Sequence, residues 1–302
     1  MTVRRWFQYL ILGCLSLVLA VACTTSPATD DAAELTELRF GVGPYFPTPN
    51  ETSDQFVPFF EYLAASVGLE ADVTVTEDWV GISEALRAGT LDVAWLGPWG
   101  YVLANHETPE IQAIATVKYK DEPTYFSVLM ARADAPFETL DEAIEQSQAA
   151  DAPLKISLAD VGSTSGWLVP TAEFERRGLD PKQVFEYNEG ASHAAQAIAV
   201  LSEQVDIASD FDRNLDVLDS TERIDKDELK IIWESEPLPN DPIAVRGGLP
   251  EEIIAGLQAA LEGIDAAKAE ELLPENYTGF VSSDGSNYEP IQAAGQAVGK
   301  LE

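Results

Sequence analysis

The chain has 302 residues, of which 52 are acidic and 18 are Lys or Arg, so its formal net charge at pH 7 is −34. A charge of this sign and size argues against nucleic acid or an anionic membrane surface as a partner, because both would be repelled. Hydrophobic residues make up 46% of the chain. This length and composition suit two domains of ordinary size or one large one.

Residues 1–22 have the pattern of a secretory signal peptide. Arg4 and Arg5 precede an apolar run at 10–22 that ends in small residues. Such a segment is removed from the mature protein, so it is set aside from the fold. We expect the mature protein in the periplasm or at the cell surface.

The end of the signal segment allows two modes of cleavage. Residues 20–22 fit a signal-peptidase site of the A-x-A type, whereas Cys23 fits the end of a lipobox. A lipobox normally has leucine three residues before its cysteine, and here the leucine stands four residues before it. We favour a lipoprotein anchored at Cys23, with 23–35 as a tether, because this cysteine would otherwise be a lone thiol. The other cysteine, Cys14, lies within the signal, so no internal disulfide or cysteine-based zinc site is expected.

The rest of the chain alternates between expected strands and helices. The first series has strands at 38–43, 73–76, 91–96, 111–118 and 125–131, and helices at 54–67 and 82–88. The second series has strands at 154–158, 184–187 and 205–208, and helices at 140–148, from 164 onward, at 192–202 and at 211–218. Strands at 229–233 and 243–245 and a helix at 251–262 follow. Such alternation predicts an α/β protein whose parallel strands are wrapped by helices.

The turn after the strand at 154–158 has the composition of an anion-binding site. Ser163, Thr164 and Ser165 supply three hydroxyls at the start of a helix, and Gly162 and Gly166 allow close approach to the backbone. Free backbone N–H groups and the helix dipole favour an anion there. An ordinary Ser/Thr helix cap with turn glycines is the open alternative. A nucleophile elbow is disfavoured because Thr164 occupies the central position of its motif.

Seven short motifs, taken in order, resemble the phosphonate and phosphite substrate-binding proteins of ABC transporters. They are Asp78-Trp-Val-Gly-Ile82, Leu91-Asp-Val-Ala-Trp-Leu-Gly-Pro98, Tyr125-Phe-Ser-Val-Leu129, Ser163-Thr-Ser-Gly166, Gly190-Ala-Ser-His193, Gln204-Val-Asp-Ile207 and Leu238-Pro-Asn-Asp-Pro242. The resemblance implies a type II periplasmic binding protein fold with two lobes, each a mixed β-sheet flanked by helices. Lobe 1 would comprise 36–131 and 238–302, and lobe 2 would comprise 132–237, with a hinge of two crossing strands.

The resemblance also implies a ligand site. Ser163, Thr164 and Ser165 would hold a phosphorus oxyanion together with His193. Tyr125 matches a tyrosine of the family's pocket, Trp79 stands where another pocket tyrosine occurs, and Asp241 matches an acidic ligand contact. Trp95, near the end of its strand, is a further candidate for an aromatic wall.

Several of these residues have alternative roles. His193, near a helix start, could be a surface or capping residue, Asp241 could be a turn acid between two prolines, and Asp210 could contact the ligand or cap the following helix. Arg213 stands where aminophosphonate binders carry a glutamate for the substrate ammonium. An organic amine is therefore a poorer candidate ligand.

The function implied is the extracytoplasmic capture of phosphite or a small alkylphosphonate such as methylphosphonate for an ABC permease and ATPase. No enzyme activity, cofactor, metal or nucleic-acid partner is expected. The protein would be a monomer that contacts the membrane only through its lipid anchor. Phosphate or aminophosphonate binding, a sensory subunit and a Ser/His hydrolase stay open as alternatives.

Overall fold

A computed structural model describes residues 35–46 and 48–302. The proposed signal peptide, the tether up to residue 34 and the lipidation site Cys23 lie outside the described residues. Among those described, no helix is both long and apolar enough to cross a bilayer.

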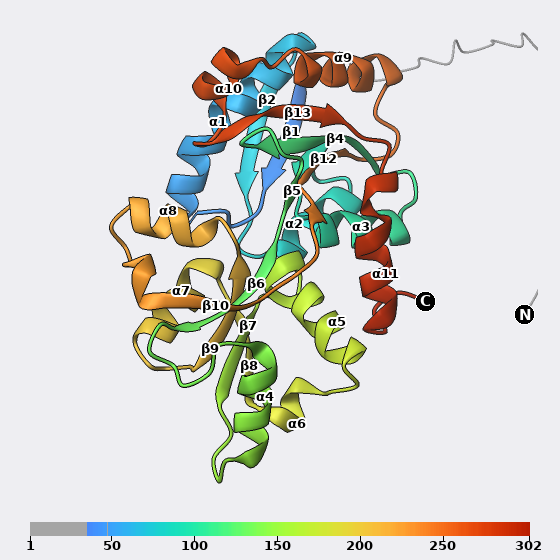
Figure 1. Cartoon of the computed structure of the whole chain (residues 1–302). Coiled ribbons are helices and arrows are strands. Elements are labelled where there is room, and N and C mark those ends of the chain that lie inside the picture. Colours follow the sequence, from blue (N-terminus) through green and yellow to red (C-terminus); the bar gives the residue numbers. More distant parts are fainter. Residues whose placement is uncertain (1–34, 47) are drawn as a thin grey trace, which may run out of the picture. The chain divides into compact units, whose positions relative to one another are not determined.

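The first sheet has six strands in the order β13-β4-β12-β3-β1-β2 (Figure 1). Their bounds are β1 Glu37–Val42, β2 Glu70–Val75, β3 Val93–Trp95, β4 Gln112–Tyr119, β12 Pro242–Val245 and β13 Tyr277–Ser282. β1 pairs in parallel with both β2 and β3, as the strand–helix alternation predicts, whereas β12 and β13 add antiparallel pairs. The sheet is therefore mixed.

Five helices lie along the chain between strands of this sheet. They are α1 Pro49–Ser66, α2 Trp79–Arg87, α3 Pro98–Glu107, α9 Glu251–Glu262 and α10 Ala266–Leu272. α1 begins five residues before the predicted helix start. Thr48 accepts from the backbone N–H of Glu51 while the Glu51 carboxylate accepts from that of Thr48, a capping box that extends the helix into the expected loop. Three aromatic residues of α1, Phe56, Phe59 and Phe60, are fully buried.

The second sheet has five strands in the order β10-β6-β9-β7-β8. Their bounds are β6 Ser127–Arg132, β7 Lys155–Ala159, β8 Glu186–Ala191, β9 Ile207–Phe211 and β10 Leu229–Glu234. The associated helices are α4 Leu140–Ala149, a π-helix η1 Thr164–Leu168 that runs into α5 Val169–Arg176, α6 Pro181–Val184, α7 His193–Leu201, α8 Asn214–Ser220 and a 3₁₀ turn Lys226–Glu228. This sheet is also mixed, since β7 pairs in parallel with β8 and β9 while β6 is antiparallel to both of its neighbours.

A two-stranded ribbon connects the two sheets. β5 (Thr124–Tyr125) pairs antiparallel with β11 (Leu238–Pro239), so the chain leaves the first sheet after β4 and returns to it at β12 through adjacent segments. β6, which the sequence assigned to the first lobe, pairs within the second sheet. The lobe boundaries proposed from the sequence stay a prediction.

The C-terminal elements after residue 263 were not predicted. β13 is the edge strand beside β4, and α11 (Glu289–Ala297) packs against both α3 and α5 (Figure 1). Their segments are short and rich in Ala, Gly and polar residues, so their apolar periodicity is weak. Because α11 contacts a helix next to each sheet, it links the two halves of the described chain.

Candidate functional site

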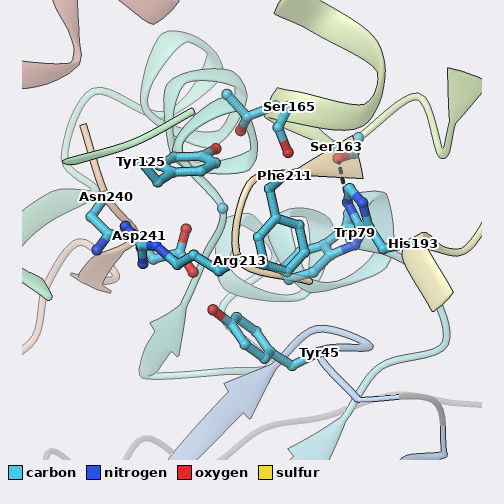
Figure 2. A pocket seen from close by; sticks show the side chains of 13 residues that line it. Tyr45, Trp79, Tyr125, Ser163, Ser165, His193, Phe211, Arg213, Asn240 and Asp241 are labelled. Carbon is cyan, nitrogen blue, oxygen red and sulfur yellow. Dashed lines mark hydrogen bonds between the residues drawn. The ribbon is translucent and has the colours of Figure 1, made fainter. Parts of the chain in front are cut away.

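A cavity of about 50 Å³ opens where the carboxyl ends of strands from both sheets meet. It is lined by Tyr45, Trp79, Gly97, Tyr125, Gly162, Ser163, Thr164, Ser165, His193, Phe211, Arg213, Asn240 and Asp241 (Figure 2). Seven residues predicted from the sequence line it together, namely Trp79, Tyr125, Ser163, Thr164, Ser165, His193 and Asp241.

The Ser163 turn forms one wall of this cavity. Ser163 follows β7 and is the N-cap of η1, where its Oγ accepts from the backbone N–H of Gly166 at 3.1 Å. The helix-cap role and the cavity position thus belong to the same residue. Thr164 turns its hydroxyl toward the first sheet, where it accepts from the N–H of Trp99, at the start of α3, at 2.8 Å. All three hydroxyl residues are buried.

Gly162 allows this turn to approach the first sheet closely. A Cβ added there would lie 2.9 Å from the Val80 nitrogen and 3.0 Å from the Trp79 carbonyl carbon. Both contacts are backbone atoms at the start of α2, which cannot rotate away. A glycine is therefore required for contact across the cavity.

His193, at the start of α7, hydrogen-bonds through both ring nitrogens. Nε2 lies 2.9 Å from the Oγ of Ser163, and Nδ1 lies 2.8 Å from Oδ1 of Asp210 (Figure 2 draws the bond to Ser163). His193 is thus in the cavity wall rather than a surface or capping residue.

Asp210 does not line the cavity, which corrects its prediction as a direct ligand contact. It is fully buried behind His193 and also accepts from the N–H of Phe211 and the side-chain amide of Asn214, both at 2.8 Å. The alternative of a helix cap is also wrong, because Arg213 occupies the N-cap position of α8. Three donors occupy the Asp210 carboxylate, so it acts on the cavity only through His193.

Trp95 likewise lies behind the wall rather than in it. Its ring is fully buried among the aromatic residues under α1, and its indole N–H donates to Oδ2 of Asp241 at 3.0 Å. The predicted direct contact of Trp95 with a ligand is corrected accordingly. Trp95 holds Asp241, which does line the cavity.

Asp241 is a cavity carboxylate in a desolvated setting. Burial raises its pKa to about 6, against the hydrogen bond from Trp95 and the charges of Arg213 and His193, which lower it. Burial also raises the pKa of Tyr125 and keeps its phenol protonated. Near neutral pH the cavity therefore holds an acceptor at Asp241 and a donor at Tyr125.

Arg213 brings a buried cation to the cavity, a role that was not predicted. Its guanidinium lies 4.1 Å from the centre of the Tyr119 ring and donates to the carbonyl of Thr124 and, at 3.4 Å, to Oδ1 of Asn240. The nearest carboxylate, Asp212, is 4.0 Å away. Desolvation lowers the pKa of this guanidinium, although nearby carboxylates oppose the shift.

Four further lining residues were missed, and three of them lie at or just after the ends of strands. Tyr45 follows β1, Gly97 follows β3 and Phe211 ends β9. The rule that ligands bind beyond the carboxyl ends of strands could have identified them. Asn240 precedes Asp241 in the motif at 238–242, but nothing in the local sequence marks it as a residue of the cavity wall. In the described part of the chain, no cluster of three His, Cys, Asp or Glu side chains could hold a metal.

Comparison with known proteins gives a consistent result. Residues 40–288 match the family described as "ABC transporter, phosphonate, periplasmic substrate-binding protein". A phosphonates-binding periplasmic protein of Escherichia coli K12 is 30% identical over 197 residues, which cover 65% of this chain and 57% of that protein. A phosphate-import protein of Mycolicibacterium smegmatis is 27% identical over 213 residues, covering 67% and 64%. The matched parts thus span less than two thirds of either relative.

Two solved structures share the fold. A binding protein component of an ABC phosphonate transporter from Pseudomonas aeruginosa superposes with a TM-score of 0.78 at 24% identity, covering 88% of this chain and 87% of its own. A Prochlorococcus marinus protein in complex with methylphosphonate gives 0.76 at 19% identity, covering 89% and 100%. The fold is that of type II periplasmic binding proteins, and the chain belongs to the family of periplasmic phosphonate-binding proteins of ABC transporters.

Proposed function

We propose that this protein is the solute-binding component of an ABC importer and that it captures a small phosphorus oxyanion in the cavity. The observation that carries the proposal is the Ser163 turn, where buried hydroxyls and a helix start face His193 across a few ångströms. Such a wall solvates an oxyanion with fixed dipoles. The P. aeruginosa protein is a component of a phosphonate transporter and the P. marinus protein was solved in complex with methylphosphonate, and both support the choice of ligand class.

The size and lining of the cavity favour a small ligand with one apolar substituent. One water needs about 10–15 Å³ of such volume, so about 50 Å³ suits an ion of only a few heavy atoms. Trp79, Tyr125 and Phe211 provide aromatic surface beside the hydroxyl wall. This surface would accept the P–H of phosphite or the P–CH₃ of methylphosphonate, whereas a phosphate hydroxyl would lose its hydrogen bond there.

Asp241 would select the protonation state of the ligand. A carboxylate only accepts hydrogen bonds, so it favours an anion that still carries a P–OH and disfavours a fully deprotonated one. Arg213 offsets part of the negative charge at this end of the cavity. The extreme acidity of the chain acts at longer range, where a Debye length of about 8 Å at physiological ionic strength screens it.

The remaining parts of the proposal concern the setting of the protein. We infer that it acts as a monomer in the periplasm or at the cell surface, anchored by lipid at Cys23, and that it delivers its ligand to a membrane permease with an ATPase. A sensory role for the same cavity would require a membrane kinase in place of the permease. Purification of the full chain from membranes with or without detergent, followed by mass spectrometry of Cys23, tests the anchor.

Single-site variants test the binding site. Ser163→Ala and His193→Ala should each weaken methylphosphonate binding by about 10- to 100-fold, because the first removes a hydroxyl donor to a buried anion and the second removes the hydrogen-bond partner that directs this hydroxyl, an effect of typically about 1.5–3 kcal/mol. Ser202→Ala, which removes an exposed hydroxyl at the C-cap of the helix that His193 begins, is the matched control. Unchanged affinity in both site variants, measured by calorimetry, would place the ligand elsewhere.

One observation favours a second candidate, a hydrolase. Ser163, His193 and Asp210 are joined at 2.9 and 2.8 Å in the order nucleophile, base and orienting acid. The Ser163 Oγ, however, also accepts from Gly166 as a helix cap, which occupies one of its lone pairs. Turnover of p-nitrophenyl acetate or p-nitrophenyl methylphosphonate that disappears in Ser163→Ala would support the hydrolase. We expect no turnover above that of the variant.

A further inference from the structure

The protonation of His193 at Nδ1 is set by Asp210. The Asp210 carboxylate is fully buried and accepts from Phe211, Asn214 and His193. An ionised carboxylate can only accept, so each of these three partners must donate to it. His193 therefore carries a hydrogen on Nδ1, and Nε2 is the nitrogen that faces Ser163 and the cavity.

The Ser163 hydroxyl has one proton and two lone pairs to share. One lone pair accepts from the N–H of Gly166 at 3.1 Å. While His193 is neutral, Nε2 is an acceptor, so the Ser163 proton must be donated to it across the 2.9 Å contact. In this state Ser163 has no proton left for a ligand.

An oxyanion in the cavity demands the opposite arrangement. If Ser163 turns its proton to the anion, a neutral Nε2 loses its donor and presents a lone pair to negative oxygens. If Nε2 is protonated, it donates to Ser163 Oγ, which then accepts from Nε2 and Gly166 and donates to the anion. Every polar atom of the Asp210–His193–Ser163 chain is then satisfied.

We propose that the Ser163–His193 hydrogen bond reverses direction when the oxyanion binds, that one proton is taken from solvent onto Nε2 of His193, and that Asp210 is the positioning residue that makes this uptake favourable. The inference rests on the proposed function. The cation Arg213 lines the same cavity, but the charged groups that interact with His193 include three carboxylates: Asp210 from β9, Asp160 from the turn after β7 and Asp241 from the loop before β12. Each stabilises an imidazolium, and Phe211 lies with its ring centre 5.0 Å away.

The chain is well suited to a direct test, since it contains only two histidines, His106 and His193. We would record ¹⁵N spectra of the imidazole nitrogens in histidine-labelled protein, with His106→Gln to assign the signals. The pH is set where the free protein shows Nε2 of His193 unprotonated, and methylphosphonate is added to saturation. The Nε2 resonance should move to the shift of a protonated nitrogen, while Nδ1 stays protonated throughout. An Nε2 that stays unprotonated in the saturated complex would overturn the proposal.

The role of Asp210 is tested by Asp210→Asn against Asp206→Asn, a carboxylate just before the same strand that bonds to the Lys155 N–H and does not line the cavity. Asp210→Asn should weaken binding about tenfold at pH 8 and by a smaller factor at pH 6, because the neutral amide no longer stabilises the imidazolium. A purely structural role would lower affinity equally at both pH values, and this result would refute the positioning role.

The two proposals fail in different ways. Absence of methylphosphonate binding to the wild-type chain at any pH would refute the proposed function. Binding with an unprotonated Nε2 would leave that function intact and refute only the proton uptake. The wild-type spectra do not depend on the folding of any binding-site variant.

Discussion

The indole N–H of Trp95 donates to Oδ2 of Asp241 at 3.0 Å, so a core residue orients the carboxylate that lines the cavity. Trp95 is fully buried under α1 and cannot reach a ligand, whereas Asp241 lines the cavity. The core of the first sheet thereby fixes the direction of a carboxylate in the site. Stability and binding are consequently linked at Asp241.

Asp241 should reduce the stability of the unliganded fold at neutral pH. Burial raises its pKa from 3.8 to about 6, so between these values the folded state holds a proton that the unfolded state has released. Stability thus falls as the pH rises through this window, by up to about 3 kcal/mol. Asp241→Asn should gain up to that amount at pH 7.5 and little at pH 4, in urea unfolding of both proteins. A gain that is the same at both pH values would contradict this origin.

The bond between Trp95 and Asp241 should appear as a coupling energy. A double-mutant cycle of Trp95→Phe and Asp241→Ala, measured by urea unfolding at pH 7.5, should give about 1.5–3 kcal/mol, the range for hydrogen bonds to charged groups. The cycle removes the packing that Trp95→Phe loses in both backgrounds. Additivity within about 0.5 kcal/mol would show that the bond contributes nothing.

The glycines that line the cavity should differ in their tolerance of a methyl group. Gly162→Ala would press against backbone atoms of Trp79 and Val80 at 2.9–3.0 Å, whereas Gly97→Ala would meet only ordinary contacts, the nearest at 3.7 Å. We expect Gly162→Ala to weaken methylphosphonate binding about tenfold or more, because the Ser163 turn could no longer approach α2. Gly97→Ala should change it by less than about threefold. Equal effects in calorimetric titrations would contradict this account of Gly162.

Much of the fold could be predicted from sequence because its elements carry strong periodicity. The buried strands β1, β3 and β7 and the aromatic face of α1 are clear examples. The predicted helix boundaries were wrong where side-chain caps determine the end of the helix, as Thr48 and Glu51 do at the start of α1. β6 was assigned to the wrong sheet because the strand itself does not show its partners. The segment after residue 263 gave no pattern, since its elements are stabilised by contacts with distant elements such as β4, α3 and α5.

The candidate site, too, could be predicted only in part from the sequence. Ser163 and His193 could be named because their residue types and motifs indicate anion chemistry. Whether a residue faces the cavity or supports one that does depends on packing, and this is why Trp95 and Asp210 were placed one layer too close. The sequence showed that Arg213 stands in place of the glutamate of aminophosphonate binders. Its position over Tyr119 in the cavity wall depends on tertiary packing and could not be predicted.

Arg213 should make the site discriminate by charge. A buried guanidinium in the wall repels a ligand ammonium and attracts the oxyanion. The wild type should bind propylphosphonate at least about tenfold more tightly than the similarly sized 2-aminoethylphosphonate. Arg213→Gln should remove this preference and weaken propylphosphonate, while Arg176→Gln, at an exposed site on α5, should leave both unchanged. A preference that survives in Arg213→Gln would mean that another group sets it.

The most direct test of the proposed function is calorimetric titration of the mature chain with phosphite, methylphosphonate, 2-aminoethylphosphonate and phosphate at one fixed salt concentration. The Ser163 wall, the aromatic surface and Arg213 together predict that phosphite or methylphosphonate binds most tightly, that phosphate is weaker and that 2-aminoethylphosphonate is weakest. The tightest Kd should lie below about 100 μM, equivalent to roughly −5.5 kcal/mol. If none of the four binds more tightly than that, the cavity is not a site for small phosphorus oxyanions.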